Sequence, residues 1–173
     1  YREAFGPSKN AVSLDPRSVD NRKLLFEVLI QGTRDTTAAE HQLKIISQME
    51  ENPLWAYDRL LNIYAARKDR ENALQVLDKV VSVPSINARI LIIAAQNYQA
   101  YNAPTRAESI YRDIIGENPQ EMEAWLRLEN SVLSRGDTTQ AISLVREGLS
   151  KFGNRLERQT APLWDQLRII YDS

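Results

Sequence analysis

Apolar residues recur along the chain with a spacing of 34 residues, and a small alanine marks each recurrence. Apolar or small side chains follow each alanine by four and by seven residues, and a bulky apolar residue precedes it by nine. Spacings of three, four and seven residues are helical. Each alanine is therefore predicted to begin the buried stripe of one helix, and the residue nine positions earlier to belong to the helix before it. The alanines are Ala39, Ala73, Ala107 and Ala141, and the preceding residues are Ile30, Tyr64, Tyr98 and Val132.

Turn-forming segments separate the two helices of each unit. The stretches RKDRE (67–71), YNAPTRAE (101–108) and SRGDTTQ (134–140) interrupt the apolar pattern. Asn52-Pro53 and Asn118-Pro119 predict a capping residue followed by a proline at the first helical position. Each unit is thus predicted to be a helix, a tight turn and a second helix. Capping boxes are predicted to pair Thr37 with Glu40, Thr105 with Glu108 and Asp137 with Gln140.

The recurring alanine has a physical reason. Two antiparallel helices joined by a short turn approach closely, and a larger side chain at the contact would push them apart. A lone hairpin cannot bury both faces, so neighbouring hairpins must stack. The predicted fold class is all-α, an α-solenoid of stacked antiparallel helix hairpins. The residues predicted to pack between helices are the four alanines with Tyr64, Tyr98 and Trp125.

These positions resemble the tetratricopeptide repeat family, whose pattern is W-x2-L-G-x2-Y, a small alanine, a bulky residue four positions on, and a proline. The resemblance covers residues 20–155 and implies a right-handed superhelix whose first helices line a concave groove. The sequence departs from the pattern at Lys23, where an aromatic is expected, and at Leu61 and Glu129, where a small residue is expected. The matching residues, in successive units, are Tyr57, Leu60 and Tyr64; Tyr98, Ala107, Tyr111 and Pro119; and Trp125 and Leu128.

The period predicts four repeats, at about 20–53, 54–87, 88–121 and 122–155. Residues 1–19, interrupted by Gly6-Pro7 and Asp15-Pro16, are interpreted as the tail of a preceding repeat. After Phe152 the register slips, and residues 156–173 are predicted to form a linker and a helix over 162–172, either a cap or the start of a further repeat. Because the chain opens with Tyr1, we interpret it as a fragment or a processed form.

Composition argues against catalysis. The chain has no cysteine and one histidine, His41, which is predicted to face solvent without ligand-spaced neighbours. Six scattered glycines form no phosphate-binding loop. We therefore expect no catalytic residue, no cofactor and no metal. The net charge of −1 gives no electrostatic reason to expect a nucleic acid, and no apolar run approaches the ~20 residues of a membrane span.

The resemblance implies that groove-facing positions lie eighteen, fifteen, fourteen and eleven residues before each alanine. In the first repeat this rule selects Asn21, Leu24, Leu25 and Val28, and in the third it adds Ile92 and Ile93. The amides of Asn62, Gln96 and Asn130 share one register, where they either hydrogen-bond a peptide backbone or are simply solvated. The candidate groove residues are Trp55, Asp58, Arg59, Asn62, Arg89, Gln96, Glu123, Arg127 and Asn130.

Three of these residues shape the expected ligand. Trp55 lies outside the packing registers, which makes it a binding candidate. Asp58 and Glu123 stand where some family members carry lysines that grip a C-terminal carboxylate, so we expect no such clamp here.

The predicted function is a non-catalytic scaffold that binds a peptide or protein segment in the concave groove. One alternative is a half-a-tetratricopeptide array of the RNA-processing type, which the segment WLRLENSVLSRG (125–136) resembles. Another is an accessory segment of a larger enzyme or of a bacterial envelope or secretion assembly. The partner is expected to be a protein rather than a small-molecule substrate, the oligomeric state stays open, and a soluble, cytoplasmic protein is favoured over a periplasmic one.

Overall fold

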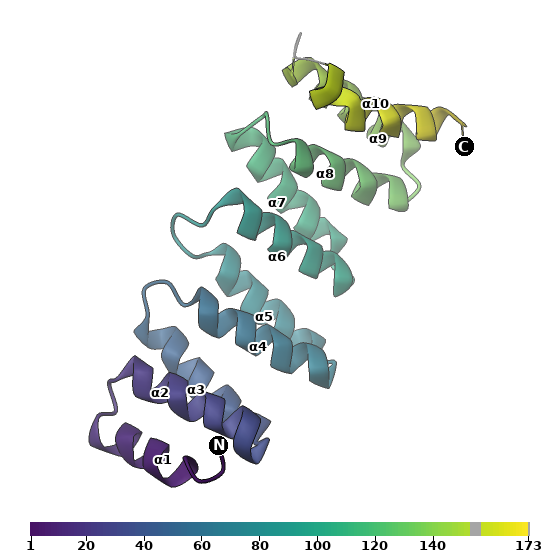
Figure 1. The fold of residues 1–173 in the computed structure, drawn as a ribbon. Helices are drawn as coiled ribbons and strands as arrows, with labels where there is room; N and C mark the ends of the chain where they lie inside the picture. The colour runs from purple at the N-terminus through teal and green to yellow at the C-terminus, as the bar shows by residue number, and fades with distance from the viewer. Residues whose placement is uncertain (153–156, 173) are drawn as a thin grey trace. The chain divides into compact units, whose positions relative to one another are not determined.

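The computed structural model describes residues 1–152 and 157–172 (Figure 1). Ten α-helices and one π-helical segment make up the regular secondary structure of this part of the chain, so the all-α prediction is confirmed. The elements are α1 (Phe5–Leu14), α2 (Val19–Val28), η1 (Leu29–Thr33), α3 (Thr36–Met49), α4 (Leu54–Arg67), α5 (Arg70–Val81), α6 (Ala88–Ala100), α7 (Pro104–Glu117), α8 (Met122–Ser134), α9 (Thr138–Phe152) and α10 (Glu157–Asp172).

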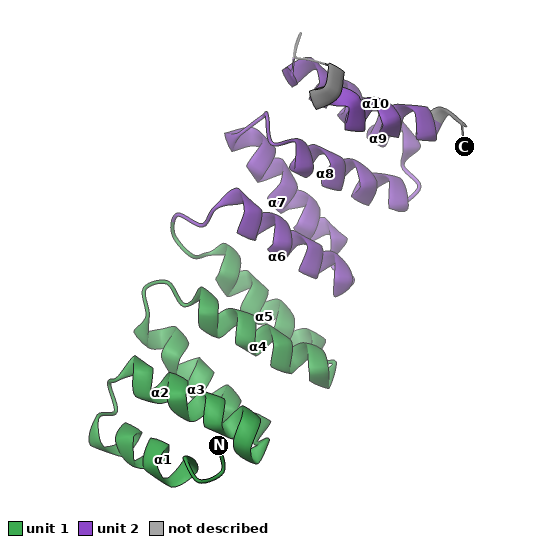
Figure 2. Cartoon of the chain, in the orientation of Figure 1, with its two compact units in different colours: residues 1–84 green, residues 85–173 purple. Residues whose placement is uncertain are grey.

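The helices form two compact units, residues 1–84 and residues 85–173 (Figure 2). In the first unit, each of the helices α1 to α5 packs against its neighbour in the sequence. In the second unit, α6 to α10 follow the same rule. Sequential packing of this kind is typical of repeat architectures, in which each hairpin contacts only its neighbours.

The tight turns inside the hairpins share one backbone geometry. Each turn contains a residue with positive φ, at Arg34, Lys68, Asn102 or Gly136, and these positions are 34 residues apart. The second helix of each hairpin starts two residues later, at Thr36, Arg70, Pro104 or Thr138. A left-handed residue costs a non-glycine side chain roughly 1–2 kcal/mol. Only the turn at Gly136 (φ 82°) avoids this cost.

The first hairpin contains one residue more than the others. In the second hairpin, the N–H of Asp69 donates to the carbonyl of Tyr64, five residues back, at 2.9 Å. In the first, the N–H of Asp35 donates to the carbonyl of Leu29, six residues back, at 3.0 Å. The π-helical segment η1 accommodates the extra residue, because its hydrogen bonds span five residues instead of four.

This insertion shifts the register of α2. Ile30 lies in the helical segment that precedes α3, as predicted, but it is only partly buried, and Leu29 is buried in its place. Leu25 and Val28 were predicted to face the groove, and both are buried. That prediction was wrong for the same reason: one added residue turns a helix face by about 100°.

Two of the three predicted capping boxes were wrong. Helix α3 is capped by Asp35, whose carboxylate accepts from the N–H of Ala38 at 2.9 Å, and Thr37 lies inside the helix. An anion is favoured at this position by the helix dipole. Helix α7 starts at Pro104 without a side-chain cap, so Thr105 does not cap it either. The third cap is confirmed, because Asp137 accepts from the N–H of Gln140 at 2.9 Å.

The prolines also lie differently from the predicted pattern. Pro53 is the residue before α4 instead of its first residue, and α8 begins three residues after Pro119. Asn118 instead accepts from the N–H of Gln120 at 3.2 Å, which makes Asn-Pro a turn. Gly6-Pro7 does not interrupt α1, because an N–H missing from the first turn of a helix would have had no helical partner.

Helix α10 begins at Glu157, five residues earlier than predicted, and continues through Pro162. The buried side chains among residues 160–170 of this helix have helical spacing, and α10 packs on α9; they are Thr160, Leu163, Leu167 and Ile170. This apolar contact compensates for the backbone hydrogen bond that Pro162 removes. Residues 153–156 of the predicted linker lie outside the described residues.

The seven predicted packing residues are all buried. Ala39, Ala73, Ala107 and Ala141 have no exposed surface, and Tyr64, Tyr98 and Trp125 expose 2% or less.

Candidate partner-binding surfaces

Trp55 lies half-buried on α4, in the first unit, and its ring is fixed by three neighbours. Phe26 of α2 meets it edge to face, with ring centroids 5.5 Å apart. Lys23 Nζ lies 5.1 Å from the indole centroid, and Arg59 Cζ lies 5.5 Å from it. Each cation–π contact at a partly exposed site stabilises by roughly 0.5–1 kcal/mol. The indole is therefore an ordered platform with two cations beside it.

Both flanking cations have a counter-ion. Lys23 Nζ pairs with Glu50 Oε1 at 2.7 Å, and Arg59 pairs with Asp58 on the same helix. The second oxygen of Glu50 is buried and has no hydrogen-bond partner in the described part of the chain. The surface around Trp55 thus offers an aromatic face, N–H donors and carboxylate acceptors, with no large net charge. Such a mixture suits a polypeptide better than a small anion.

Asn62 lies on α4 two turns after Trp55. Its side chain is exposed and makes no hydrogen bond with the described residues. An unpaired amide on an exposed helix face can accept from and donate to the backbone of a bound peptide.

The second unit carries a polar cluster on α6 and α8. With its amide oxygen turned toward α8, Gln96 accepts from Nε and Nη2 of Arg127, both at 3.1 Å. Arg127 Nη2 also pairs with Glu123 Oε1 at 3.2 Å, one helical turn away. Asn130 donates to the carbonyl of Leu126 at 2.8 Å. The three predicted amides are therefore not equivalent, because Gln96 and Asn130 already have partners whereas Asn62 does not.

The remaining candidates divide by exposure. Arg89 is exposed at the start of α6. Ile92 was expected to face the groove and is buried, while its neighbour Ile93 is half exposed.

Lys23 was noted in the sequence only as a departure from the repeat pattern, yet it supports Trp55. No sequence signal could identify it, because its role follows from the shifted register of α2.

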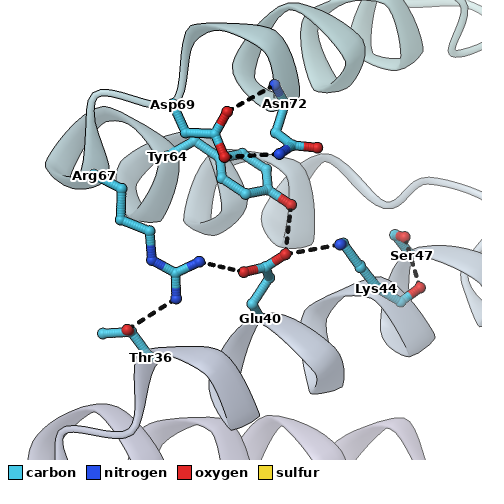
Figure 3. Close-up of polar contacts among 8 residues, drawn as sticks. All are labelled: Thr36, Glu40, Lys44, Ser47, Tyr64, Arg67, Asp69 and Asn72. Atoms are coloured by element: carbon cyan, nitrogen blue, oxygen red, sulfur yellow. Dashed lines mark hydrogen bonds and ion pairs between the residues drawn. The ribbon is translucent and has the colours of Figure 1, made fainter.

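A polar cluster outside these surfaces joins α3 to α4 (Figure 3). Glu40 accepts from Lys44 at 2.7 Å, from the hydroxyl of Tyr64 at 2.9 Å and from Arg67. Arg67 also donates to the hydroxyl of Thr36 at 2.9 Å. Burial opposes ionisation of Glu40, but the hydrogen bonds from these three partners outweigh it and lower its pKa to about 2. The ionised carboxylate is a structural link between two hairpins.

Glu129 of α8 is the opposite case. Its side chain has no exposed surface, and neither carboxylate oxygen has a hydrogen-bond partner among the described residues. Burial raises its pKa to about 7. Glu129 occupies a position where the repeat pattern has a small residue. No contact among the described residues offsets the cost of burying its carboxylate.

The described residues contain no group of three or more His, Asp or Glu side chains that could hold a metal ion. His41 is exposed on α3. No helix in the described part of the chain is long and apolar enough to cross a membrane.

Solved structures with a similar arrangement of helices include MamA, which is 17% identical in sequence and has a TM-score of 0.57, with 86% of each chain covered. YrrB, described as a TPR protein with an unusual peptide-binding site, is 12% identical, with a TM-score of 0.53 and coverage of 94% of this chain and 91% of its own. The chain has the tetratricopeptide repeat fold. Pseudomonas aeruginosa PilF is 14% identical, with a TM-score of 0.51 and coverage of 98% of this chain and 79% of its own.

No protein-family model matches this tetratricopeptide-fold chain, and no curated protein matches it in sequence. The predicted resemblance to tetratricopeptide repeats is confirmed by the structural neighbours. At identities of 12–17%, this likeness concerns the fold.

Proposed function

We propose that the protein is a non-catalytic scaffold that binds a segment of a partner protein along the exposed faces of its first helices, α4 in one unit and α6 and α8 in the other. The observation that carries this proposal is the ordered Trp55 platform with Lys23 and Arg59 beside it. Aromatic and arginine side chains dominate the binding energy of protein interfaces. The proposed contact residues are Trp55, Asp58, Arg59, Asn62, Arg89, Gln96, Glu123, Arg127 and Asn130.

The tetratricopeptide fold supports this function. The structural neighbour YrrB has a peptide-binding site by its own description. The near-zero net charge favours a protein over a nucleic acid as the partner. In the second unit, Arg127 would exchange its contacts with Gln96 and Glu123 for contacts with the ligand, so this part of the surface would contribute more to specificity than to affinity.

Panning a random peptide library against the complete chain, followed by calorimetry with the selected peptides, tests the proposal. Truncating Trp55 to alanine removes the platform, and we expect a loss of affinity of about tenfold or more. Asn62→Ala removes an exposed, unpaired amide, so it should weaken binding without lowering the thermal midpoint. Arg112→Ala, on the exposed face of the second helix α7, is the matched control and should have no effect. Loss of binding in Arg112→Ala together with full binding in Trp55→Ala would place the working surface on the second helices and refute the proposal.

A further inference from the structure

A pocket of about 120 Å³ opens in the first unit between its second helices, α3 and α5. Helix α4 lies between them in the sequence and packs against both. Leu60 of α4 and Val76 of α5 give the pocket an apolar floor, and polar side chains of α3 and α5 surround it. It holds none of the residues around Trp55, so it is a separate site on the molecule.

The cations at this pocket are only partly neutralised. Lys44 Nζ is held by Glu40 at 2.7 Å (Figure 3) and also interacts with the Tyr64 hydroxyl. Lys79, on α5, is exposed and its side chain forms no ion pair or hydrogen bond with the described residues. None of the residues that line the pocket is acidic. The pocket therefore carries positive charge that the protein does not balance locally.

Two amides stand beside these lysines. Gln48 on α3 and Gln75 on α5 both line the pocket, are exposed and make no side-chain hydrogen bond with the described residues. Their N–H groups add donors to those of Lys79. An apolar floor with donors at the rim fits an alkyl chain that ends in a carboxylate, because the alkyl part covers Leu60 and Val76 while the oxygens accept from the rim. Inorganic phosphate would pair with the lysines but would leave the apolar side chains of Leu60 and Val76 uncovered.

The polar residues around the pocket are not a general feature of the repeat. Positions 68 residues later show what the other unit carries at the same register. The floor residues Leu60 and Val76 correspond to Leu128 and Leu144, so the apolar part is retained. The rim residues differ, and the unpaired lysine is replaced by an acid. Lys44, Gln48, Gln75 and Lys79 correspond to Arg112, Gly116, Ser143 and Glu147.

We propose that this pocket binds the side-chain carboxylate of a glutamate residue on a partner polypeptide, with Lys79 as the main cation and Gln48 and Gln75 as supporting donors. The site acts independently of the Trp55 surface, so it remains even if the proposed function of that surface is wrong.

N-acetyl-glutamate α-amide, whose only charge is the side-chain carboxylate, is the probe for this site. Titrated into the ¹⁵N-labelled chain, it should shift the side-chain amide signals of Gln48 and Gln75 in a saturable manner, with a Kd of about 1–10 mM, as expected for a single small group. Lys79→Gln should weaken binding by about threefold or more, the upper range for one exposed ion pair. Lys79→Glu, which copies the second unit, should abolish it. Lys9→Gln, an exposed lysine on α1, is the control and should leave the Kd unchanged.

Three further arms separate the alternatives. N-acetyl-glutamine α-amide is the uncharged isostere, and equal binding of it would overturn the assignment of a carboxylate. Tighter binding of inorganic phosphate than of the glutamate probe would mean a phosphate site and would also overturn it. An equal loss in Lys79→Gln and Lys9→Gln would show general electrostatic attraction instead of a site. Trp55→Ala should leave the Kd for the probe unchanged, and a change would show that the two surfaces are not independent.

Discussion

Arg67, the last residue of α4, reaches back to Glu40 on α3, the residue that follows the buried Ala39. The same ion pair recurs 68 residues later, where Arg135 at the end of α8 pairs with Glu108 of α7 at 3.0 Å. Glu108 is buried and also accepts from the hydroxyl of Ser131 at 3.0 Å. In each unit, therefore, a carboxylate on the second helix of one hairpin anchors the end of the first helix of the next.

Glu40→Ala should destabilise the first unit by roughly 1–3 kcal/mol, because it leaves the Tyr64 hydroxyl and the Arg67 guanidinium without their acceptor. Only 14% of the Glu40 side chain is exposed, so water replaces the lost bonds poorly. Urea denaturation at pH 7 measures the difference. Glu51→Ala, an exposed acid with no partner among the residues that the structure describes, is the control and should stay within about 0.5 kcal/mol of wild type. Equal effects of the two substitutions would show that the Glu40 cluster does not link the hairpins.

The spacing of the alanines predicted the hairpins, because the close contact at Ala39 and its equivalents recurs in every unit and requires a small side chain. It could not predict the register of α2, since the inserted residue lies before the first alanine and no spacing between alanines spans it. It also misassigned Glu40 to a capping box. Thr37 and Glu40 have the correct local spacing, but Tyr64 and Arg67 come close to Glu40 only in the folded chain.

Glu129 should make stability fall as the pH rises. Its pKa is about 7 in the folded chain, against an ordinary value of 4.5, so between these values the folded state binds a proton that the unfolded state has released. The free energy of unfolding contributed by this group is therefore fully present below pH 4.5 and is lost as the pH rises through 7. Moving the pKa from 4.5 to about 7 corresponds to about 3 kcal/mol.

Glu129→Gln, an uncharged isostere, isolates this contribution. The variant should be more stable than wild type at pH 8 by up to about 3 kcal/mol, and the difference should vanish near pH 4.5. Urea denaturation of both proteins across this range is the measurement. Glu40→Gln should show the opposite pH dependence, because the pKa of Glu40 is lowered. Its loss of stability relative to wild type should be present above pH 4.5 and should decline as the pH falls toward 2. A difference between Glu129→Gln and wild type that does not depend on pH would mean that Glu129 reaches water or a partner in solution.

Two tryptophans of the second unit should differ sharply in their contribution to stability. Trp125 on α8 exposes 2% of its surface and donates its indole N–H to the carbonyl of Pro119 at 3.0 Å. Trp164 on α10 exposes 58%. Trp125→Ala should cost about 3–5 kcal/mol, the usual range for a buried aromatic, whereas Trp164→Ala should cost less than about 1 kcal/mol. Thermal denaturation followed by circular dichroism compares them, and a larger effect at Trp164 would mean that α10 packs through its other face.

The π-helical segment gives the sharpest test of the register. Deleting Gln31 removes the inserted residue and would let the N–H of residue 35 donate to the carbonyl of Leu29 five residues back, as in the other hairpins. Gln31 is exposed, and its one side-chain hydrogen bond, to Glu27 at 3.0 Å, lies on the surface. We therefore expect the deletion variant to fold with a loss of no more than about 1.5 kcal/mol.

Deleting Asn62, an exposed residue of α4, is the control. Helix α4 has no inserted residue, so this deletion turns Ile63 and Tyr64 by about 100° relative to Leu60 and exposes a buried tyrosine. A cost of at least about 3 kcal/mol follows, the range for losing a buried aromatic, and the protection of the amides in the first unit should fall accordingly. Amide hydrogen exchange on both variants reports the outcome for each helix. If the deletion of Gln31 unfolds α2 and α3 as thoroughly as the deletion of Asn62 unfolds α4 and α5, the segment 29–33 is an essential part of the fold and the inserted-residue account of the first hairpin is wrong.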